Sequence, residues 1–458
     1  MIAVVLLLAM AVVAMFGDLF PWRRTSQVLV FLGLPVAALA CLRSGLPFPG
    51  DMLVMDGYAR AFSALTVVLT AIVFWVIYAM PERGRYWVHS HIALILFSAI
   101  GALLMVSATH LVTLFLGIEL LSIPLYVLAV SRKTDRLSQE AGLKYFVMGA
   151  FTSGILLFGM ALLYAATGQL YLSAIVSVVM QYGVSASFLA GAGMVLAGLF
   201  FKVGLVPFHF WIPDVYDGTP TPHVTWMSAV AKVAAMATLF RVVAGYFGEL
   251  FPFWHVVAWV VVVLTLIVSN MVALAQGSIK RMLAYSSIAQ AGFMAMLLLA
   301  PGSPYPAVIF YYGLAYTLSL ASVFFVLVTI EDVIDTENPF YRLTGLAFRN
   351  RLLAILLAVG LFSLSGVPPL AGFFAKYLVL ATVLLAGRIG MVLLAVAMSV
   401  VGLVYYLRWI PVLWTSGDYP SISLNGIQKA TAIFLIVLLV ATGLFPGTWL
   451  NLLGLFFR

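Results

Sequence analysis

Four charged side chains lie deep inside long apolar stretches of this sequence: Glu119, Lys202, Lys232 and Lys376. Each charge at the middle of a membrane costs roughly 2.5–3.5 kcal/mol on insertion scales, so such residues usually have a function. A buried amine without a carboxylate partner releases its proton more readily, and a nearby acid opposes that release. One acid among three lysines therefore predicts a proton relay, switched by making or breaking an ion pair of Glu119 with a lysine. A static salt bridge is the alternative for Glu119.

Five further polar residues are auxiliary candidates. Lys144 lies near the start of an apolar stretch, where it joins the relay or extends its ammonium to the interface. His209 follows Lys202 by seven residues on a similar helix face, where it extends the path or forms an interfacial hydrogen bond. His110 and His223 each begin an apolar stretch, and serve as proton uptake or release groups or as plain interface residues. The fifth candidate, Gln290, is taken up with the resemblance below.

The elements that position these residues are membrane-spanning helices. Hydrophobic residues make up 64% of the 458 residues and charged residues only 8%, which excludes a soluble core with a polar surface. The apolar stretches are long enough to cross a membrane as helices, and the alternation of an outer-membrane barrel is absent. The first stretch lacks the basic start and cleavage site of a signal peptide, so we expect it to be retained. The fold class is an all-α polytopic membrane protein with about fourteen spans, at 1–16, 26–43, 63–80, 90–108, 110–130, 143–166, 187–212, 222–247, 254–276, 281–300, 305–330, 352–386, 389–414 and 428–452.

Two spans contain helix-breaking residues in their middle. Span seven has Gly204 and Pro207, and span twelve has Gly366, Pro368 and Pro369. Proline removes a helix hydrogen bond and clashes with the preceding turn, so each span is expected to form two half-helices joined by unwound backbone. Lipid cannot satisfy that backbone, and we therefore expect both breaks to face protein or water.

The two breaks lie five helices apart, an odd offset that inverts the orientation in the membrane. This predicts two inverted five-helix repeats, 90–247 and 254–414, with a transport site at the broken helices. Helices one to three (1–80) precede the repeats and one helix (428–458) follows, in a single membrane domain covering 1–458. Prolines that simply kink membrane helices are the alternative.

Basic residues predict the orientation, because they are enriched in cytoplasmic loops. With the N-terminus outside, the cytoplasmic loops hold Arg23, Arg24, Arg83, Arg85, Arg132, Lys133, Arg136, Lys280, Arg281, Arg342, Arg349, Arg351 and Lys429. The other loops and the C-terminus hold only Arg43, Arg60, Arg388 and Arg458, with Arg241 at a span end. We expect a multi-pass protein of the inner (plasma) membrane with both termini on the non-cytoplasmic side. The net charge of +8 then reflects topology and not nucleic-acid binding.

The sequence contains no pattern for a cofactor or metal. Cys41 is the only cysteine, which excludes a cysteine cluster for iron–sulfur or zinc, and His89 and His91 share a loop without further metal ligands. Neither nucleotide-binding glycine motif is present. We therefore expect no redox or hydrolytic chemistry in this chain.

Several segments resemble the antiporter-like subunits of proton-pumping complex I. They are "LFLGIELLSIPLYVL", "FFKVGLVPFHFWIPDVYDGTPTP", "AVAKVAAM", "NMVALAQGSIKRMLAYSSIAQAGF" and "SLSGVPPLAGFFAKYLVL". Within that family the chain is most similar to the subunit N type of NADH–quinone oxidoreductase, because Lys376 replaces a glutamate typical of subunit M. The absence of a long lateral helix and the segment "VMDGYA" point the same way.

This resemblance implies a role for each matched residue. Glu119 and Lys202 would form the modulating ion pair, Lys232 the central relay, and Lys376 the terminal group. Gln290 departs from the family pattern, which has histidine there, and glutamine cannot carry a charge. That substitution puts a titrating relay at position 290 in doubt.

The resemblance also implies partners and cofactors. Subunits of the K and M types would be the neighbours, followed by those of the J, A, H and L types, with lipids around them. NAD, flavin, iron–sulfur clusters and quinone would be held by partner subunits.

Two other functions use the same helices. An Mrp-type cation/proton antiporter subunit would need more carboxylates or hydroxyl clusters at depth, and would depend on sodium. A purely structural scaffold would keep full activity when the lysines are replaced by methionine.

Overall fold

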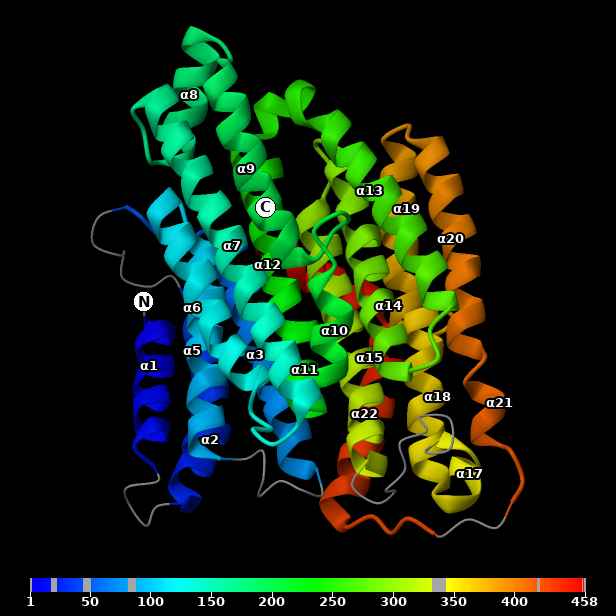
Figure 1. Cartoon of the computed structure of the whole chain (residues 1–458). Helices are drawn as coiled ribbons and strands as arrows, with labels where there is room; N and C mark the ends of the chain where they lie inside the picture. The colour runs from blue at the N-terminus through cyan, green and yellow to red at the C-terminus, as the bar shows by residue number, and fades with distance from the viewer. Residues whose placement is uncertain are drawn as a thin grey trace.

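The chain folds into a bundle of helices, seen in a computed structural model (Figure 1). The structure describes residues 2–17, 23–43, 51–80, 88–331, 343–417, 421–454 and 456. Within these residues the only β-type pairings are two isolated bridges, Leu53 with Ala108 and His110 with Tyr171. The helices run roughly side by side along one direction, as spans of a membrane must.

Helices of the first half cover the predicted spans one to eight. Their bounds are α1 (Ile2–Met15), α2 (Arg23–Leu42), α3 (Gly57–Ala79), α5 (His89–Ser107), α6 (Leu111–Ala129), α7 (Arg136–Thr167), α8 (Leu172–Tyr182), α9 (Ala186–Val203), α10 (Trp211–Gly218), α11 (Thr221–Trp226), the π-helical η1 (Met227–Ala231), α12 (Lys232–Phe240) and the π-helical η2 (Arg241–Tyr246). The helix that carries Lys232 is thus one run, Thr221–Tyr246, with two π-helical segments.

The second half contains η3 (Gly248–Leu250), α13 (Phe251–Leu274), α14 (Ile279–Ala295), η4 (Met296–Leu299), α15 (Tyr305–Glu331), α17 (Leu346–Arg349), α18 (Arg351–Ser365), α19 (Ala371–Leu385), α20 (Ile389–Leu407), α21 (Ile410–Leu413), α22 (Gly426–Leu444) and α23 (Pro446–Leu453). Among the described residues, eleven helices are long and apolar enough to cross a membrane. The other three predicted spans correspond to α1, α2 and the pair α18 and α19.

Both predicted helix breaks are present. Helix α9 ends at Val203 and α10 begins at Trp211, while α18 ends at Ser365 and α19 begins at Ala371. Gly204 and Gly366 end the first halves with φ values of +85° and +89°, a left-handed conformation that glycine adopts without strain. Each gap also contains a cis peptide bond, at Val206–Pro207 and Pro368–Pro369.

Three boundaries differ from the sequence expectation. Span fourteen is not continuous to 452, because α22 ends at Leu444 and Pro446 begins the separate helix α23. Helix α8 lies in a connection where no helix was expected, and it is amphipathic and too short to span a membrane. His89 and His91 lie in the first turn of α5 and not in a loop. Of the topology residues, Arg83, Arg85, Arg342 and Arg458 and the side chains of Arg23 and Arg24 lie outside the described residues.

The core of the bundle is centred on α15, in which every residue from Val308 to Ile330 is buried. This helix packs against α3, α18, α19 and α22, and α13 packs against α14 and α20. The prolines of the breaks behave differently: Pro207, Pro368 and Pro369 are exposed on the surface of this chain.

Candidate proton-transfer site

Lys202 lies in the last turn of α9, just before the first break, and its side chain is buried. Its Nζ donates to Ser122 Oγ of α6 at 2.7 Å. Glu119, one turn earlier on α6, accepts a hydrogen bond from Ser153 of α7. No ion-pair contact joins Glu119 to Lys202 among the described residues, so each of the two groups is held by a serine.

Aromatic rings flank this lysine. The Tyr145 ring centre lies 6.0 Å from Lys202 Nζ, and Tyr145 stacks on Trp211 with 4.5 Å between ring centres. Trp211 Nε1 donates to Phe201 O at 3.1 Å, which ties the start of α10 back to the end of α9. Aromatic side chains next to Lys202 thus hold the end of α9 and the start of α10 together.

Lys232 follows the π-helical segment η1 and is buried. Its Nζ donates to Ser287 O at 3.1 Å and to Ser287 Oγ of α14. A Cβ added to Gly204 would lie 3.9 Å from Lys232 Nζ, so the first break comes close to this ammonium. Two buried hydroxyls, those of Tyr216 and Tyr316, have no hydrogen-bond partner within the described part of the chain.

Gln290 lies three residues beyond Ser287 on α14 and therefore on the same face. Its Oε1 accepts a hydrogen bond from Tyr312 of α15. Its Nε2 donates to Leu364 O at 2.9 Å and to Tyr406 Oη of α20 at 3.2 Å. Gln290, which stands where the family pattern has histidine, thus lies at the centre of a buried polar cluster.

Lys376 lies on α19, just beyond the second break, and is buried. Its Nζ donates to Ser365 O, a carbonyl at the end of α18, at 2.9 Å, and to Ser399 Oγ at 3.4 Å. The Phe293 ring centre of α14 is 5.0 Å from the same atom. No carboxylate pairs with Lys232 or Lys376 in the described regions.

Helix α14 contacts both Lys232 and Lys376. Ser287, Gln290 and Phe293 are spaced by three residues, and they contact Lys232, the carbonyl of Leu364 and Lys376, respectively. Leu364 and Ser365 are adjacent in the chain, so Gln290 and Lys376 bond neighbouring carbonyls. Polar groups therefore extend across the interior from Lys232 to Lys376.

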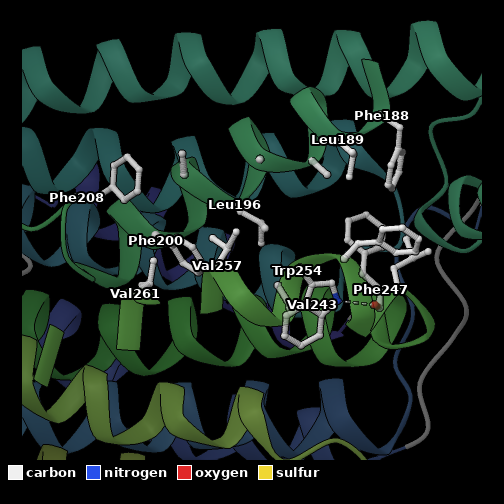
Figure 2. Close-up of a pocket in the computed structure, with 15 residues that line it drawn as sticks. Phe188, Leu189, Leu196, Phe200, Phe208, Val243, Phe247, Trp254, Val257 and Val261 are labelled. Atoms are coloured by element: carbon white, nitrogen blue, oxygen red, sulfur yellow. Dashed lines mark hydrogen bonds between the residues drawn. The ribbon is translucent and has the colours of Figure 1, made fainter. Parts of the chain in front are cut away.

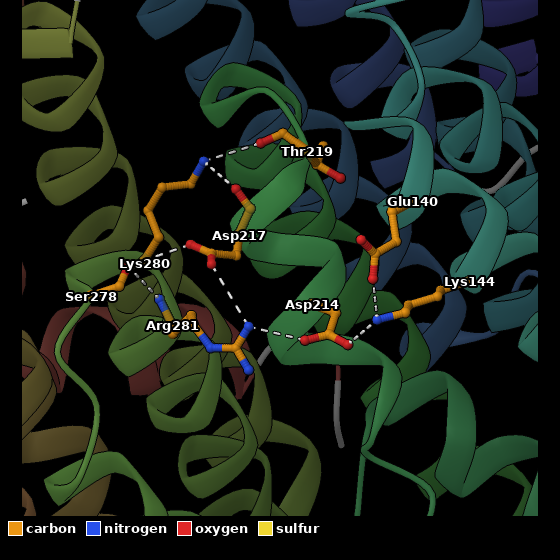
Figure 3. Close-up of polar contacts among 8 residues, drawn as sticks. All are labelled: Glu140, Lys144, Asp214, Asp217, Thr219, Ser278, Lys280 and Arg281. Carbon is orange, nitrogen blue, oxygen red and sulfur yellow. Dashed lines mark hydrogen bonds and ion pairs between the residues drawn. The ribbon is translucent and has the colours of Figure 1, made fainter. Parts of the chain in front are cut away.

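Lys144 belongs to a different cluster, formed with side chains of α10 and α14 (Figure 3). It pairs with Glu140 at 2.6 Å and with Asp214 of α10 at 2.7 Å, and its side chain is 42% exposed. Arg281 of α14 pairs with the same Asp214 at 3.0 Å and with Asp217 at 3.7 Å. This network ties α7 and α14 to the half-helix after the first break, and it does not bring Lys144 to the buried lysines.

The three candidate histidines have different surroundings. His110 caps α6, with Nδ1 accepting from Val112 N at 3.2 Å, and burial lowers the pKa of His110. His209 is buried in the first break, and its Nδ1 has no hydrogen-bond partner among the described residues. His223 is buried at the start of α11, with its ring centre 4.7 Å from that of His91. None of the three contacts a relay lysine in the hydrogen bonds described above.

The sequence profile of the family described as NADH:quinone oxidoreductase/Mrp antiporter, membrane region, matches residues 108–402. The chain belongs to this family. The matched region contains Glu119, Lys202, Lys232, Gln290 and Lys376. The matched region thus covers most of both predicted repeats.

Relatives with high coverage are NADH-quinone oxidoreductase subunits N. That of Deinococcus radiodurans is 37% identical, with 98% of this chain and 94% of the relative covered. That of Trichlorobacter lovleyi is 36% identical, with 87% and 82% covered. A chain of respiratory complex I from Thermus thermophilus with bound aureothin has 33% identity and a TM-score of 0.81, with 98% of both chains covered. A chain of the Mrp complex from Dietzia shares the fold, with a TM-score of 0.83 at 21% identity over 99% of this chain and 95% of that one.

A long apolar groove lies between α9 and α13 (Figure 2). It encloses about 320 Å³ and is lined by residues such as Phe188, Phe200, Phe208, Phe247 and Trp254. The Trp254 indole donates to Phe247 O at 2.9 Å. Proton transfer needs hydroxyls, amines or water along the way, so this groove is not a proton path.

Several residues of the site were missed by sequence reasoning, namely Ser122, Ser153, Ser287, Tyr312 and Tyr406. Ser122 follows Glu119 by three residues and Ser287 precedes Gln290 by three, so helix periodicity alone could have found these two. The tyrosines come from other helices, and only the packing of α15 and α20 against α14 brings them in. An ion pair of the buried Arg241 with the half-exposed Asp56, at 3.0 Å, was missed for the same reason.

Proposed function

We propose that this chain is the antiporter-like, proton-translocating subunit of a quinone-reducing complex and holds no redox centre itself. The observation that carries the proposal is the row of buried polar groups from Lys232 and Ser287 past Gln290 to Lys376, in which Gln290 and Lys376 bond neighbouring carbonyls. The subunit N relatives, at 36–37% identity over most of the chain, support the same assignment.

Glu119 acts on the first lysine. In the structure Glu119 and Lys202 are held by Ser153 and Ser122, so the direct pair is open. Closing the pair strengthens the hold of Lys202 on its proton, since an opposite charge at ~4 Å and an effective dielectric of ~20 contributes about 4 kcal/mol. Opening it favours release towards Lys232, and Lys376 receives the proton at the far end.

This proposed function implies which cofactors and subunits surround the chain and where the chain is located. NAD, flavin, iron–sulfur clusters and quinone belong to partner subunits, and K-type and M-type subunits flank this chain. The exposed prolines at both breaks support contact with protein or water, because lipid cannot cover unwound backbone. We place the protein in the inner membrane, with both termini on the non-cytoplasmic side.

The Mrp-type antiporter shares the fold, and the fold alone does not separate the two functions. The chemistry of the site favours the proton. Lys202, Lys232 and Lys376 are buried, no carboxylate is buried among the described residues, and Glu119 is half-buried, whereas a sodium ion needs several oxygen ligands.

The test replaces Glu119 or Lys376 with alanine in the assembled complex, reconstituted in sealed vesicles. Protons moved per quinone reduced are expected to fall in both variants. Unchanged stoichiometry in both would reject the relay. Full dependence of transport on sodium would favour the Mrp reading.

A further inference from the structure

Two tyrosine hydroxyls surround Gln290 on either side. Tyr312 Oη donates to Gln290 Oε1, and Gln290 Nε2 donates to Tyr406 Oη at 3.2 Å. Ser286, also on α14, shares a further hydrogen bond with Tyr406. All four side chains are at least 96% buried, so the hydroxyls are shielded from bulk water.

This cluster lies between Lys232 and Lys376. Ser287, which holds Lys232, is adjacent in sequence to Ser286, and Leu364 O, which holds Gln290, is adjacent to the carbonyl that holds Lys376. On the Lys232 side, the buried hydroxyls of Tyr216 and Tyr316 both lie near Ser287, which holds Lys232. Buried polar groups of this kind are usually satisfied by internal water, which can link Lys232 to the cluster.

We propose that Tyr312 and Tyr406 carry the proton across the middle of this chain, with Gln290 as the positioning residue that fixes both hydroxyls. This inference rests on the proposed relay between Lys232 and Lys376. A glutamine at this point is then compatible with proton transfer, because the charge-carrying step passes to its two partners.

The transfer is balanced at each hydroxyl. The Tyr312 oxygen accepts a proton on a lone pair from internal water on the Lys232 side, and its own O–H proton passes to water that leads to Tyr406. The Tyr406 oxygen accepts that proton, and its own O–H proton leaves through water towards the Lys376 amine. Each tyrosine is neutral before and after, and rotation of the hydroxyl resets it. In sum, the Lys232 ammonium loses one proton and the Lys376 amine gains one.

The chain offers a matched control beside each tyrosine. Tyr311 is equally buried, but its hydroxyl donates to Thr442 O of α22 at 3.0 Å, away from Gln290. Tyr405 is buried too, and its hydroxyl donates to Asn270 Oδ1 of α13 at 3.2 Å. Phenylalanine at either control position removes a buried hydroxyl of the same kind from the same helix.

The experiment measures proton translocation by the assembled complex in sealed vesicles. Tyr312→Phe and Tyr406→Phe are each expected to slow it about tenfold or more, as expected for loss of a proton-transfer group. Tyr311→Phe is expected to retain the parent rate, and Tyr405→Phe, whose ring contacts Tyr406, is expected to slow translocation less than Tyr406→Phe does. Equal rates in all four variants would overturn the inference. If Tyr312→Phe does not assemble, Tyr406→Phe with its own control decides the question.

A rescue separates proton transfer from packing. Histidine accepts and releases protons near neutrality, so Gln290→His is expected to restore translocation in the Tyr312→Phe background. A packing role for the hydroxyl predicts no rescue, and that result would overturn the proton-carrying role of Tyr312.

Lys232→Met, measured in parallel, tests the underlying relay. Full translocation in this variant would reject the proposed function itself. Loss in Lys232→Met together with parent rates in both tyrosine variants would reject the tyrosine path alone.

Discussion

The two helix breaks are built alike at the backbone. Gly204 and the residue after it both donate their N–H groups to Phe200 O, at 2.7 and 2.9 Å. Gly366 and the residue after it do the same with Phe362 O, at 3.1 and 3.0 Å. Both are helix ends in which a left-handed glycine lets the chain reverse, and both place a lysine next to the break.

The surroundings of the two breaks differ. Around the first, Val206 N donates to Thr265 Oγ1 of α13 at 3.0 Å, and the half-helix after the gap is tied to α7 and α14 through Asp214. Around the second, Ser363 Oγ of α18 accepts from Gly372 N at 3.2 Å, so the gap is closed within its own span.

This difference indicates that the two breaks have different roles in the relay. The first is connected to neighbouring helices, and its lysine donates to Ser122, one turn from Glu119, so it can respond to changes elsewhere. The second holds Lys376 with the Ser365 carbonyl of the break itself and with the Ser399 hydroxyl of α20, so that lysine depends on the shape of the break. We therefore expect the first break to receive the signal and the second to set the proton affinity at the end of the relay.

The largest effect is expected from Lys376→Arg. A guanidinium is never deprotonated in proteins, so it keeps the charge and cannot pass a proton on. Proton translocation by the assembled complex should fall about tenfold or more. Lys144→Arg, in the exposed ion network, is the control and should keep the parent rate. Translocation at the parent rate in Lys376→Arg would contradict a titrating role.

The next effect concerns the first break alone. Thr265→Val leaves the buried Val206 N–H without its acceptor, which costs about 1–3 kcal/mol of stability. Thermal unfolding of the purified complex measures the loss, and Thr265→Ser should retain the hydroxyl and most of the stability. A valine variant as stable as the serine variant would show that the hydroxyl does not hold the gap.

Replacing each of the two glycines by alanine compares the effect of the two breaks on proton translocation. Gly204→Ala and Gly366→Ala should each cost about 1–2 kcal/mol, because both need a left-handed residue. The new Cβ at 366 would lie 3.1 Å from Lys376 Cδ, whereas that at 204 would meet Ile212 Cδ1 at 2.1 Å. Gly366→Ala should therefore reduce translocation more than Gly204→Ala at similar stability. The reverse order would contradict the local control of Lys376.

The smallest effect is expected at the ion network. Asp214→Asn removes the contacts to Lys144 and Arg281, which are partly exposed and together contribute about 1 kcal/mol at low salt. Glu140→Gln removes only an exposed contact within α7 and should change stability less. Salt titration of thermal stability checks both, since screening should reduce the difference between Asp214→Asn and the parent.

The sequence was sufficient for the membrane class, the position of the spans and both breaks. These follow from local rules: apolar length, the missing N–H of proline and the left-handed freedom of glycine. It also placed Lys202, Lys232 and Lys376 in the interior, because each lies far from the end of an apolar stretch. The π-helical segments beside Lys232 and the break at Pro446 were not predicted, since apolar length does not report helix pitch.

The partners of these lysines were decided by tertiary structure. Ser122 lies 80 residues from Lys202 in the chain, and Tyr406 lies 116 residues from Gln290. A hydroxyl one helix turn away from a charge can point to lipid, to protein or to that charge, and only the packing of helices selects among these. The sequence thus determined which charges enter the membrane, and the fold determined which neutral groups hold them and connect them.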